Sequence, residues 1–166
     1  RMGLPMGDLS GGMFGAFAVA GALLRREREG RGASIDLALL DCQVSLLTYI
    51  AQYHWTDGKV PGPAGSGHRS VMPYGAYATR DGHLIIAVFN NRFWAGFCAA
   101  MERREWEHDP RFATNPDRVA HRAALEPLLV EAFTTRVTAE WLERLHREGV
   151  PVAPIQPVDG VLADEQ

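Results

Sequence analysis

The sequence of 166 residues predicts an α/β fold, in which a helix–strand–helix run is followed by a smaller α+β domain. Near the N-terminus, a long apolar helix rich in small residues precedes an alternating stretch and a second helical pattern. This order is typical of half of an open α/β sheet. Further on, Asp81-Gly82 lies between two β-rich stretches and predicts a hairpin. Since one strand cannot form a sheet, the partner strands of the first run are expected outside these residues.

The first helix is expected to begin after Ser10, a good N-cap residue, and to run to about Arg28 with Gly30 at the C′ position. Its small residues predict close packing on all sides, because each interior glycine costs up to about 1 kcal/mol that a solvent-facing helix would not offset. The apolar part, residues 13–24, is shorter than the ~18 uninterrupted apolar residues of a membrane span. We therefore expect a buried helix and no membrane anchor.

The next stretches complete the first run. Residues 33–39 alternate between apolar and polar side chains and predict a strand. Residues 40–53 carry apolar side chains at helical spacing and predict a helix. Residues 56–72 are rich in glycine and proline, which indicates a linker between domains.

The residues after the linker predict a hairpin and then mostly helical structure. Asn115 is the expected N-cap of a helix with Pro116 at N1. Pro127 is expected to kink that helix. Thr138 is the expected N-cap of the last long helix, which would run to Glu148 with Gly149 at the C′ position. The expected elements are strands at 74–79 and 83–89, a helix at 91–101 with Phe93, Trp94 and Phe97 buried, a short turn at 106–112, helices at 115–134 and 138–148, an extended piece at 152–155 and a final turn at 158–163.

Composition and charge exclude several functions. With 17 basic and 20 acidic residues, the net charge of −3 gives no electrostatic basis for binding nucleic acid or an anionic membrane. The six histidines and two cysteines show no metal-ligand spacing, so no metal site is expected. Cys42 and Cys98 are expected to be reduced thiols of a cytoplasmic protein. The N-terminus opens in a loop without signal-peptide features, and we expect a piece of a longer protein.

Asp8 is the candidate catalytic residue. An aspartate at this place is a common helix cap, but Ser10 is also available for that purpose. The N–H groups of a helix N-terminus keep a carboxylate ionised and can stabilise an oxyanion formed beside it. Gly11 and Gly12 would let a substrate approach the backbone closely. An ionised, positioned carboxylate can attack a thioester, and the mixed anhydride formed keeps the acyl group activated for transfer.

These motifs together resemble one family. The pattern Gly-Asp-x-x-x-Gly, a small-residue helix and Ala-Leu-Leu-x-Arg-Glu-x-x-Gly-Arg-Gly is similar to that of the class III CoA-transferases (CaiB/BaiF), which include formyl-CoA transferase and α-methylacyl-CoA racemase. Later elements also match: Pro-Tyr-Gly-Ala-Tyr-Ala-Thr-Arg-Asp-Gly-His, then Asp-Pro-Arg-Phe with a following Arg118, and Gly-Val-Pro-Val-Ala-Pro-Ile. The resemblance covers nearly the whole chain in order.

The resemblance implies a fold and a mechanism. The family has a large domain with a Rossmann-like sheet and a smaller domain, in two interlinked chains of a homodimer. Asp8 matches the catalytic aspartate, which accepts the acyl group and then carries CoA as a thioester. CoA thioester and carboxylic acid are substrates, and no cofactor is permanently bound. Residues 1–55 would end the first part of the large domain, 56–72 would be the linker, and 73–166 the small domain. Gly62, Gly65 and Gly67, with His68 beside them, fall where formyl-CoA transferase has a loop that closes over the intermediate.

Two alternatives remain open. A racemase of the same fold would use Asp8 as an acid/base on the α-carbon. In that branch a glutamate of the small domain joins the site, and the corresponding position here is about Asn90, which favours transfer. The second alternative is a catalytically incomplete interaction module, because most CoA contacts of the family would lie outside these residues.

Overall fold

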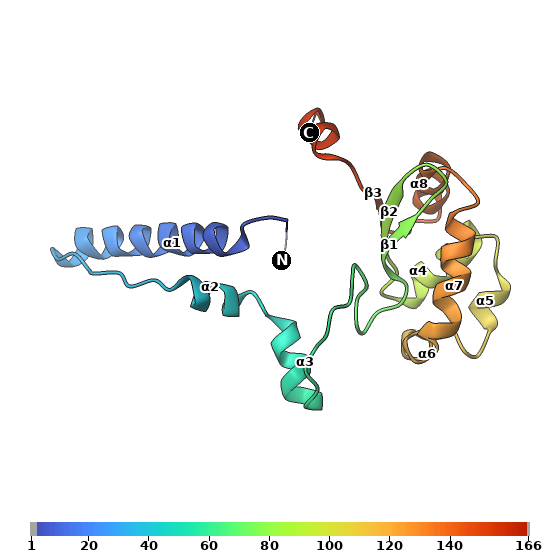
Figure 1. Cartoon of the computed structure of the whole chain (residues 1–166), viewed down its shortest axis with the longest axis horizontal. Coiled ribbons are helices and arrows are strands. Elements are labelled where there is room, and N and C mark those ends of the chain that lie inside the picture. The colour runs from blue at the N-terminus through green and yellow to red at the C-terminus, as the bar shows by residue number, and fades with distance from the viewer. Residues whose placement is uncertain (1–2, 166) are drawn as a thin grey trace. The chain divides into compact units, whose positions relative to one another are not determined.

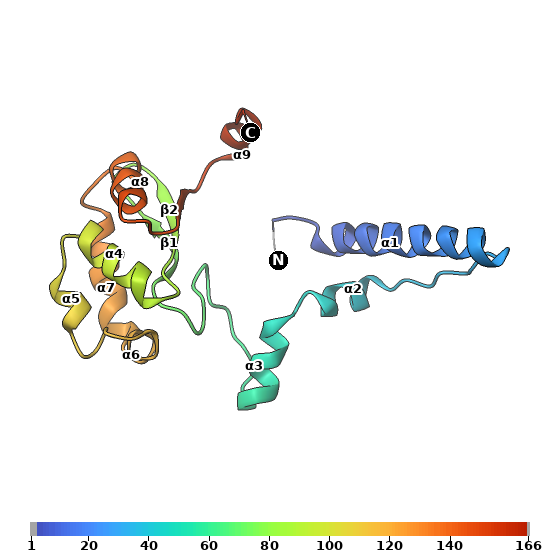
Figure 2. The same cartoon turned by 180° about the vertical axis from the view of Figure 1, so that it is seen from behind.

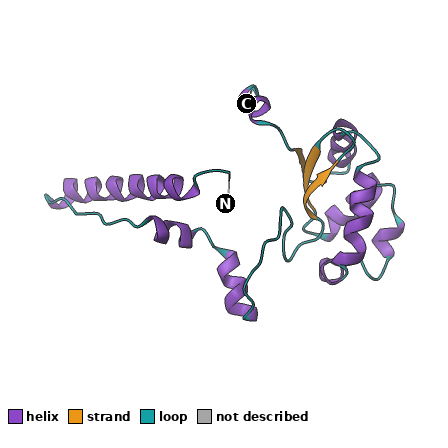
Figure 3. Cartoon of the chain, viewed as in Figure 1, coloured by secondary structure: helices purple, strands orange, loops and turns teal. Residues whose placement is uncertain are grey.

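The structure, a computed structural model, describes residues 3–165. It is mixed helical with one small antiparallel sheet (Figures 1 and 3). The chain divides into two compact units. The boundary between them in the sequence lies between Gly62 and Pro63, inside the predicted linker. The expected N-terminal loop includes residues 1 and 2, which lie outside the described residues.

The first unit consists of three helices (Figure 1): α1 (Met6–Glu29), α2 (Leu39–Ser45) and α3 (Tyr49–Asp57). The predicted end of α1 is confirmed, because Gly30 adopts a left-handed conformation (φ 71°) and donates its N–H to the carbonyl of Arg26. The predicted start is wrong. The helix begins at Met6 after Pro5, and the hydroxyl of Ser10 donates to the carbonyl of Gly7 within the helix. Proline suits this place because the N–H that it lacks would have no helical acceptor.

Two further predictions for this unit are wrong. Residues 33–38 form no strand in the described part of the chain. A strand is held by hydrogen bonds to a neighbouring strand, and no described strand pairs with these residues. The expected helix over residues 40–53 is divided into α2 and α3. The break is at Thr48, whose positive φ of 43° cannot continue an α-helix.

The packing of α1 also differs from the expectation. Among its described residues only Ser10 and Gly11 are buried, and the element of the unit that packs along α1 is the short helix α2. By length and composition alone α1 could cross a membrane. The core helices of soluble proteins meet the same two criteria. Its exposed large side chains include Met13, Phe17 and Leu24.

The second unit contains the sheet, formed by β1 (Tyr74–Ala78), β2 (His83–Ala87) and β3 (Val152–Pro154). The strands lie in the order β1–β2–β3, and both pairs are antiparallel. The predicted hairpin is confirmed: the register pairs Ala78 with His83 across the turn that contains Asp81-Gly82. Buried residues alternate with partly or fully exposed ones along β1 and β2, so the sheet has one face on the core.

Helices cover that face. Figures 1 and 2 both show α7 (Arg122–Phe133) beside the hairpin, and α7 contacts β1 while α8 (Thr138–Arg147) contacts β3. Phe133 lies at the centre of the core, with ring centroids 5.0 Å from Tyr77 and 5.3 Å from Trp141. The predicted burial of Trp94 and Phe97 is confirmed, whereas Phe93 is only partly buried. The remaining helices are α4 (Asn91–Ala100), α5 (Glu105–His108), α6 (Asn115–Ala120) and α9 (Val158–Leu162).

Three helix boundaries differ from the predictions. Thr114 caps α6 by accepting from the N–H of Asp117, so Asn115 is not the cap. The helix breaks at His121 and continues through Pro127, which lies inside α7. Thr138 is the first residue of α8 rather than its N-cap. At α8 the carboxylate of Asp81, from the turn between β1 and β2, accepts from the N–H of Thr138, a contact that no local pattern contains.

Candidate functional site

Asp8 lies in the first turn of α1 and is exposed. Among the described residues, no hydrogen bond or ion pair engages its carboxylate. Its place in the first turn suits a negative charge, because the free N–H groups of a helix N-terminus carry partial positive charge. The carboxylate is therefore accessible and lies near the backbone N–H groups of the helix N-terminus. Its catalytic role stays a prediction.

The residues that share the face of Asp8 on α1 are glycines. Positions three, four and seven residues further along a helix lie on the same face, and here they are Gly11, Gly12 and Gly15. Gly11 is buried against α2, where an added Cβ would overlap the Cδ2 atom of Leu39. At Gly12 and Gly15 an added Cβ would meet nothing within 4 Å. Gly11 thus serves the packing of α1 on α2, whereas Gly12 leaves the space beside Asp8 open.

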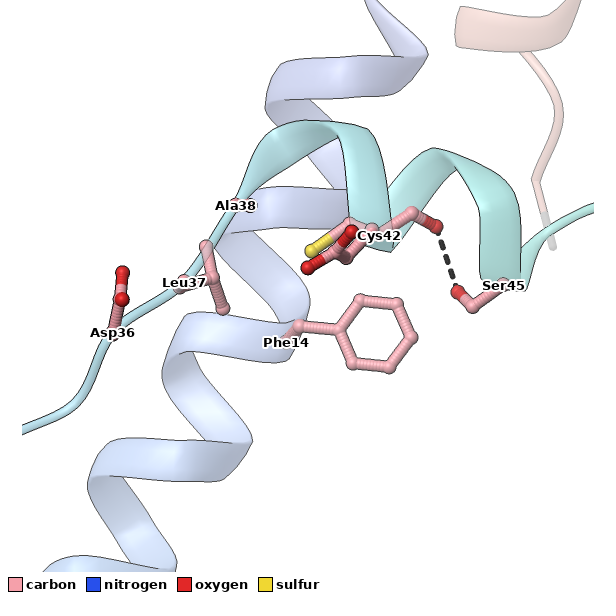
Figure 4. A pocket seen from close by; sticks show the side chains of 7 residues that line it. Phe14, Asp36, Leu37, Ala38, Cys42 and Ser45 are labelled. Atoms are coloured by element: carbon pink, nitrogen blue, oxygen red, sulfur yellow. Dashed lines mark hydrogen bonds between the residues drawn. The ribbon is translucent and has the colours of Figure 1, made fainter.

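Two cavities of the first unit lie near α1, and Asp8 lines neither. The apolar one, of about 310 Å³, lies on the opposite face of the helix, since its lining residues Met13 and Phe17 are five and nine positions beyond Asp8. The other, of about 260 Å³, lies between α1 and α2 (Figure 4), where Phe14 projects beside Cys42 and Ser45. The hydroxyl of Ser45 donates there to the carbonyl of Cys42 at 2.7 Å.

The structure divides the four predicted loop residues between the two units. Gly62 ends the first unit, and Gly65, Gly67 and His68 belong to the second. Gly65 has a positive φ of 60°, a conformation that glycine adopts without strain. The ring of His68 stacks on that of Tyr74, with centroids 5.1 Å apart, and the backbone N–H of His68 donates to the carbonyl of Tyr74.

Sequence reasoning missed the side chains that hold this loop. Asn115 and Arg122 bond to the backbone of residues 68–72, and so does Arg118, which is fully buried with its guanidinium 4.5 Å from the ring centroid of Trp94. Burial lowers the pKa of Arg118 to about 10, so it is still a cation at neutral pH. A buried arginine cannot be identified from a local pattern, because exposed arginines look the same in sequence.

Metal ligands and thiols are the other side chains that could carry chemistry. Residues 3–165 contain no group of three or more histidine, cysteine or acidic side chains placed to hold a metal ion. Cys42 and Cys98 are both buried free thiols. Burial raises the pKa of Cys98 to about 12, so its thiol is protonated and weakly nucleophilic at neutral pH.

Over its whole length, residues 1–166, the sequence matches the family model of CoA-transferase family III. The chain belongs to this family. The resemblance inferred from the motifs is therefore confirmed, and the helix that bears Asp8 and the helix-covered hairpin are parts of a family III CoA-transferase fold.

Named relatives agree with this assignment. The chain is 36% identical over 166 residues to succinyl-CoA:glutarate CoA-transferase of Mus musculus. The match covers 100% of this chain and 38% of that protein. It is 33% identical over 156 residues to acetyl-CoA:oxalate CoA-transferase of Acetobacter aceti, covering 94% of itself and 40% of the relative. A solved CaiB/BaiF family protein from Brucella suis superposes with a TM-score of 0.82 at 36% identity, over 99% of this chain and 44% of that one. The chain thus spans less than half the length of these family III proteins.

Proposed function

We propose that this chain is the part of a longer family III CoA-transferase that carries its nucleophile, and that the nucleophile is Asp8. The family membership of all 166 residues supports transfer of CoA as the reaction. The observation that carries the residue assignment is the exposed carboxylate in the first turn of α1, beside the open surface at Gly12. Such a carboxylate is accessible, as a nucleophile for a thioester must be.

In the proposed reaction the carboxylate oxygen of Asp8 attacks the thioester carbonyl of the donor, and the C–S bond breaks with release of CoA thiolate. The thiolate then attacks the aspartyl carbonyl of the mixed anhydride, which frees the donor acid and leaves an aspartyl-CoA thioester. The acceptor carboxylate repeats the two steps in reverse, and Asp8 is regenerated. Each intermediate retains the activation of the thioester, so the sequence needs no external energy source. The helix N-terminus stabilises the oxyanions that form beside it.

The substrates proposed are an acyl-CoA and a free carboxylic acid. The mouse relative is named for succinyl-CoA and glutarate, and the A. aceti relative for acetyl-CoA and oxalate. A small acyl-CoA donor and a small acid acceptor are therefore the substrates to test first. We also propose an interlinked homodimer for the complete protein, located in the cytoplasm and without a permanently bound cofactor.

Transfer is preferred over racemisation on one observation. The position at which the racemase branch would place its second acid is close to Asn90, and this side chain caps α4 by accepting from the N–H of Phe93 at 2.9 Å. An amide committed to a helix cap cannot act as a general acid or base.

Trapping of the covalent intermediate tests the proposal. The complete protein, treated with acyl-CoA and then hydroxylamine, is expected to carry a hydroxamate on the peptide that contains Asp8. Asp8→Asn is expected to lose the label and to reduce kcat by about 10³-fold or more, as removal of a nucleophile does in other covalent enzymes. Glu27→Gln, which removes an exposed acid from the same helix, is the matched control and should retain both.

The outcomes separate the alternatives. Full transferase activity in Asp8→Asn would refute the assignment of the nucleophile. Exchange of the α-proton in deuterated water without CoA transfer would establish the racemase reading instead. If wild-type protein neither transfers CoA, nor exchanges the proton, nor becomes labelled, the chain belongs to a non-catalytic interaction module.

A further inference from the structure

The base of the glycine-rich segment is held to the second unit by three side chains of α6 and α7. Asn115, Arg118 and Arg122, which we call the anchor, all bond to backbone atoms of residues 68–72. Their partners lie 43 to 54 residues away in the sequence. The anchor is therefore a tertiary feature of the second unit rather than a local turn.

Arg122 makes the largest set of these contacts. Its Nη2 donates to the carbonyl of His68 at 2.7 Å, with longer bonds of 3.3 Å to Val71 and 3.4 Å to Arg69. Its Nη1 lies 3.2 Å from the sulfur of Met72. A planar guanidinium with five donors can satisfy several diverging acceptors at once, which a lysine ammonium cannot do in the same geometry.

The other two anchor residues fix Met72. Asn115 accepts from its N–H at 3.1 Å and donates to the carbonyl of Ser70 at 2.8 Å. Arg118 donates through Nε to the carbonyl of Met72 at 2.7 Å. The N–H and the C=O of one residue are thus bonded to neighbouring positions of a single helix, so the backbone there has little freedom.

The segment is asymmetric. Towards β1, the N–H of His68 donates to the carbonyl of Tyr74, and the hydroxyl of Ser66 accepts from the N–H of Ala76 at 2.9 Å. On the other side, residues 60–65 take part in a single hydrogen bond within the described chain, from the N–H of Gly67 to the carbonyl of Ala64. An added Cβ at Gly62 or at Gly65 would meet nothing within 4 Å.

We propose that Arg122 is a positioning residue of the transfer reaction, which fastens residues 66–72 so that movement of the glycine-rich segment is confined to residues 60–65. The inference rests on the function proposed above and on the family resemblance, which implies that this segment closes over the intermediate. It divides the predicted loop into a moving part that contains Gly62 and Gly65 and a fixed base that contains Gly67 and His68.

Hydrogen exchange in the complete protein tests the fastening. In wild type, the amides of residues 60–65 are expected to exchange faster than those of Gly67, His68, Ser70 and Met72, because the N–H groups of these four residues are hydrogen-bonded. Arg122→Ala should raise the exchange rate of residues 66–72 by about tenfold, and Arg122→Lys by less. Arg111→Ala is the matched control, because Arg111 pairs with Asp109 on the surface and does not contact the segment.

Kinetics test whether the fastening serves the reaction. Arg122→Ala is expected to reduce kcat by about tenfold, equivalent to about 1.4 kcal/mol in activation free energy, with KM for acyl-CoA within about twofold of wild type. Arg122→Lys should recover part of the lost kcat. A residue that served stability alone would lower Tm and leave the kcat of the folded fraction unchanged.

The proposal is overturned if residues 66–72 exchange at the wild-type rate in Arg122→Ala, or if their exchange rises while kcat stays the same. Should Arg122→Ala fail to fold, Arg122→Lys decides by the same two measurements. A failure of the proposed function is distinguishable, because it would appear as full activity of Asp8→Asn or as absence of transfer by the wild type, neither of which depends on Arg122.

Discussion

Asp81 lies in the turn between β1 and β2, and its carboxylate is bonded to the first residue of α8. It accepts from the N–H of Thr138 at 2.7 Å and from its hydroxyl at 2.9 Å, and the hydroxyl of Thr79 donates to it at 3.3 Å. The hairpin thus supplies the cap of a helix that begins 57 residues later. The two bonds from Thr138 hold the pKa of Asp81 below its ordinary value of 3.8.

We predict that Asp81→Ala lowers Tm in a pH-dependent way. Because the pKa of the folded state is lowered, the stabilisation is fully present above pH 3.8 and is lost as the pH falls below that value. Thermal unfolding followed between pH 2.5 and 7 should therefore show a constant Tm difference from wild type near neutrality, which shrinks in acid. Asp159→Ala, a change at an exposed aspartate of α9, should give no such pattern. Equal Tm values for Asp81→Ala and wild type at pH 7 would contradict the assignment.

At the scale of elements, α4 packs against α8 through a glycine. A Cβ at Gly96 would lie 2.6 Å from the carbonyl oxygen of Glu148, a backbone atom that cannot turn aside. The same two helices are joined by Arg144, whose Nε donates to the carbonyl of Ala100 at 2.9 Å. The close approach places the aromatic side chains of α4 and α8, Phe97 and Trp141, in one core.

We predict that Gly96→Ala destabilises the protein. Helix propensity alone would make this change stabilising by about 1 kcal/mol, because alanine loses less backbone entropy. The overlap with Glu148 should reverse that sign, since packed helices cannot separate without loss of core contacts. Denaturant unfolding of the complete protein measures the effect, and a gain in stability would show that the helices tolerate the added methyl group.

At the scale of the whole chain, the two units differ in how they are stabilised. The second unit has a core of buried side chains around Phe133, including Trp94, Phe97, Leu125 and Trp141. In the helices of the first unit the buried residues are Ser10, Gly11 and Cys42, and many large apolar side chains are exposed. Burial of apolar area is the main source of folding free energy. The second unit therefore has a hydrophobic core that can stabilise it alone, and the first unit has none.

We therefore predict that residues 63–166 fold when expressed separately and that residues 1–62 do not. The separate second unit should show a near-ultraviolet circular dichroism signal from its buried tryptophans and a single cooperative melting transition. Residues 1–62 alone should remain unfolded or aggregate, because their apolar surface is uncovered. A cooperative transition of the isolated first unit would contradict this.

The sequence alone determined the family, the position of the nucleophile candidate and most of the second unit. The Asp81-Gly82 hairpin and the end of α1 at Gly30 were predictable because turn chemistry and left-handed caps depend on a few adjacent residues. Short-range signals of this kind are contained in the chain itself.

Tertiary structure decided the rest. The alternation of residues 33–39 predicts a strand, but a strand exists only with a partner. Asn115 is a residue type that often caps helices, yet its side-chain amide bonds to the backbone of residues 70 and 72. The N-cap of α6 is Thr114 instead. The anchor contacts of Arg118 and Arg122 join residues more than forty positions apart in the sequence. The burial of Arg118 therefore arises only when the chain has folded.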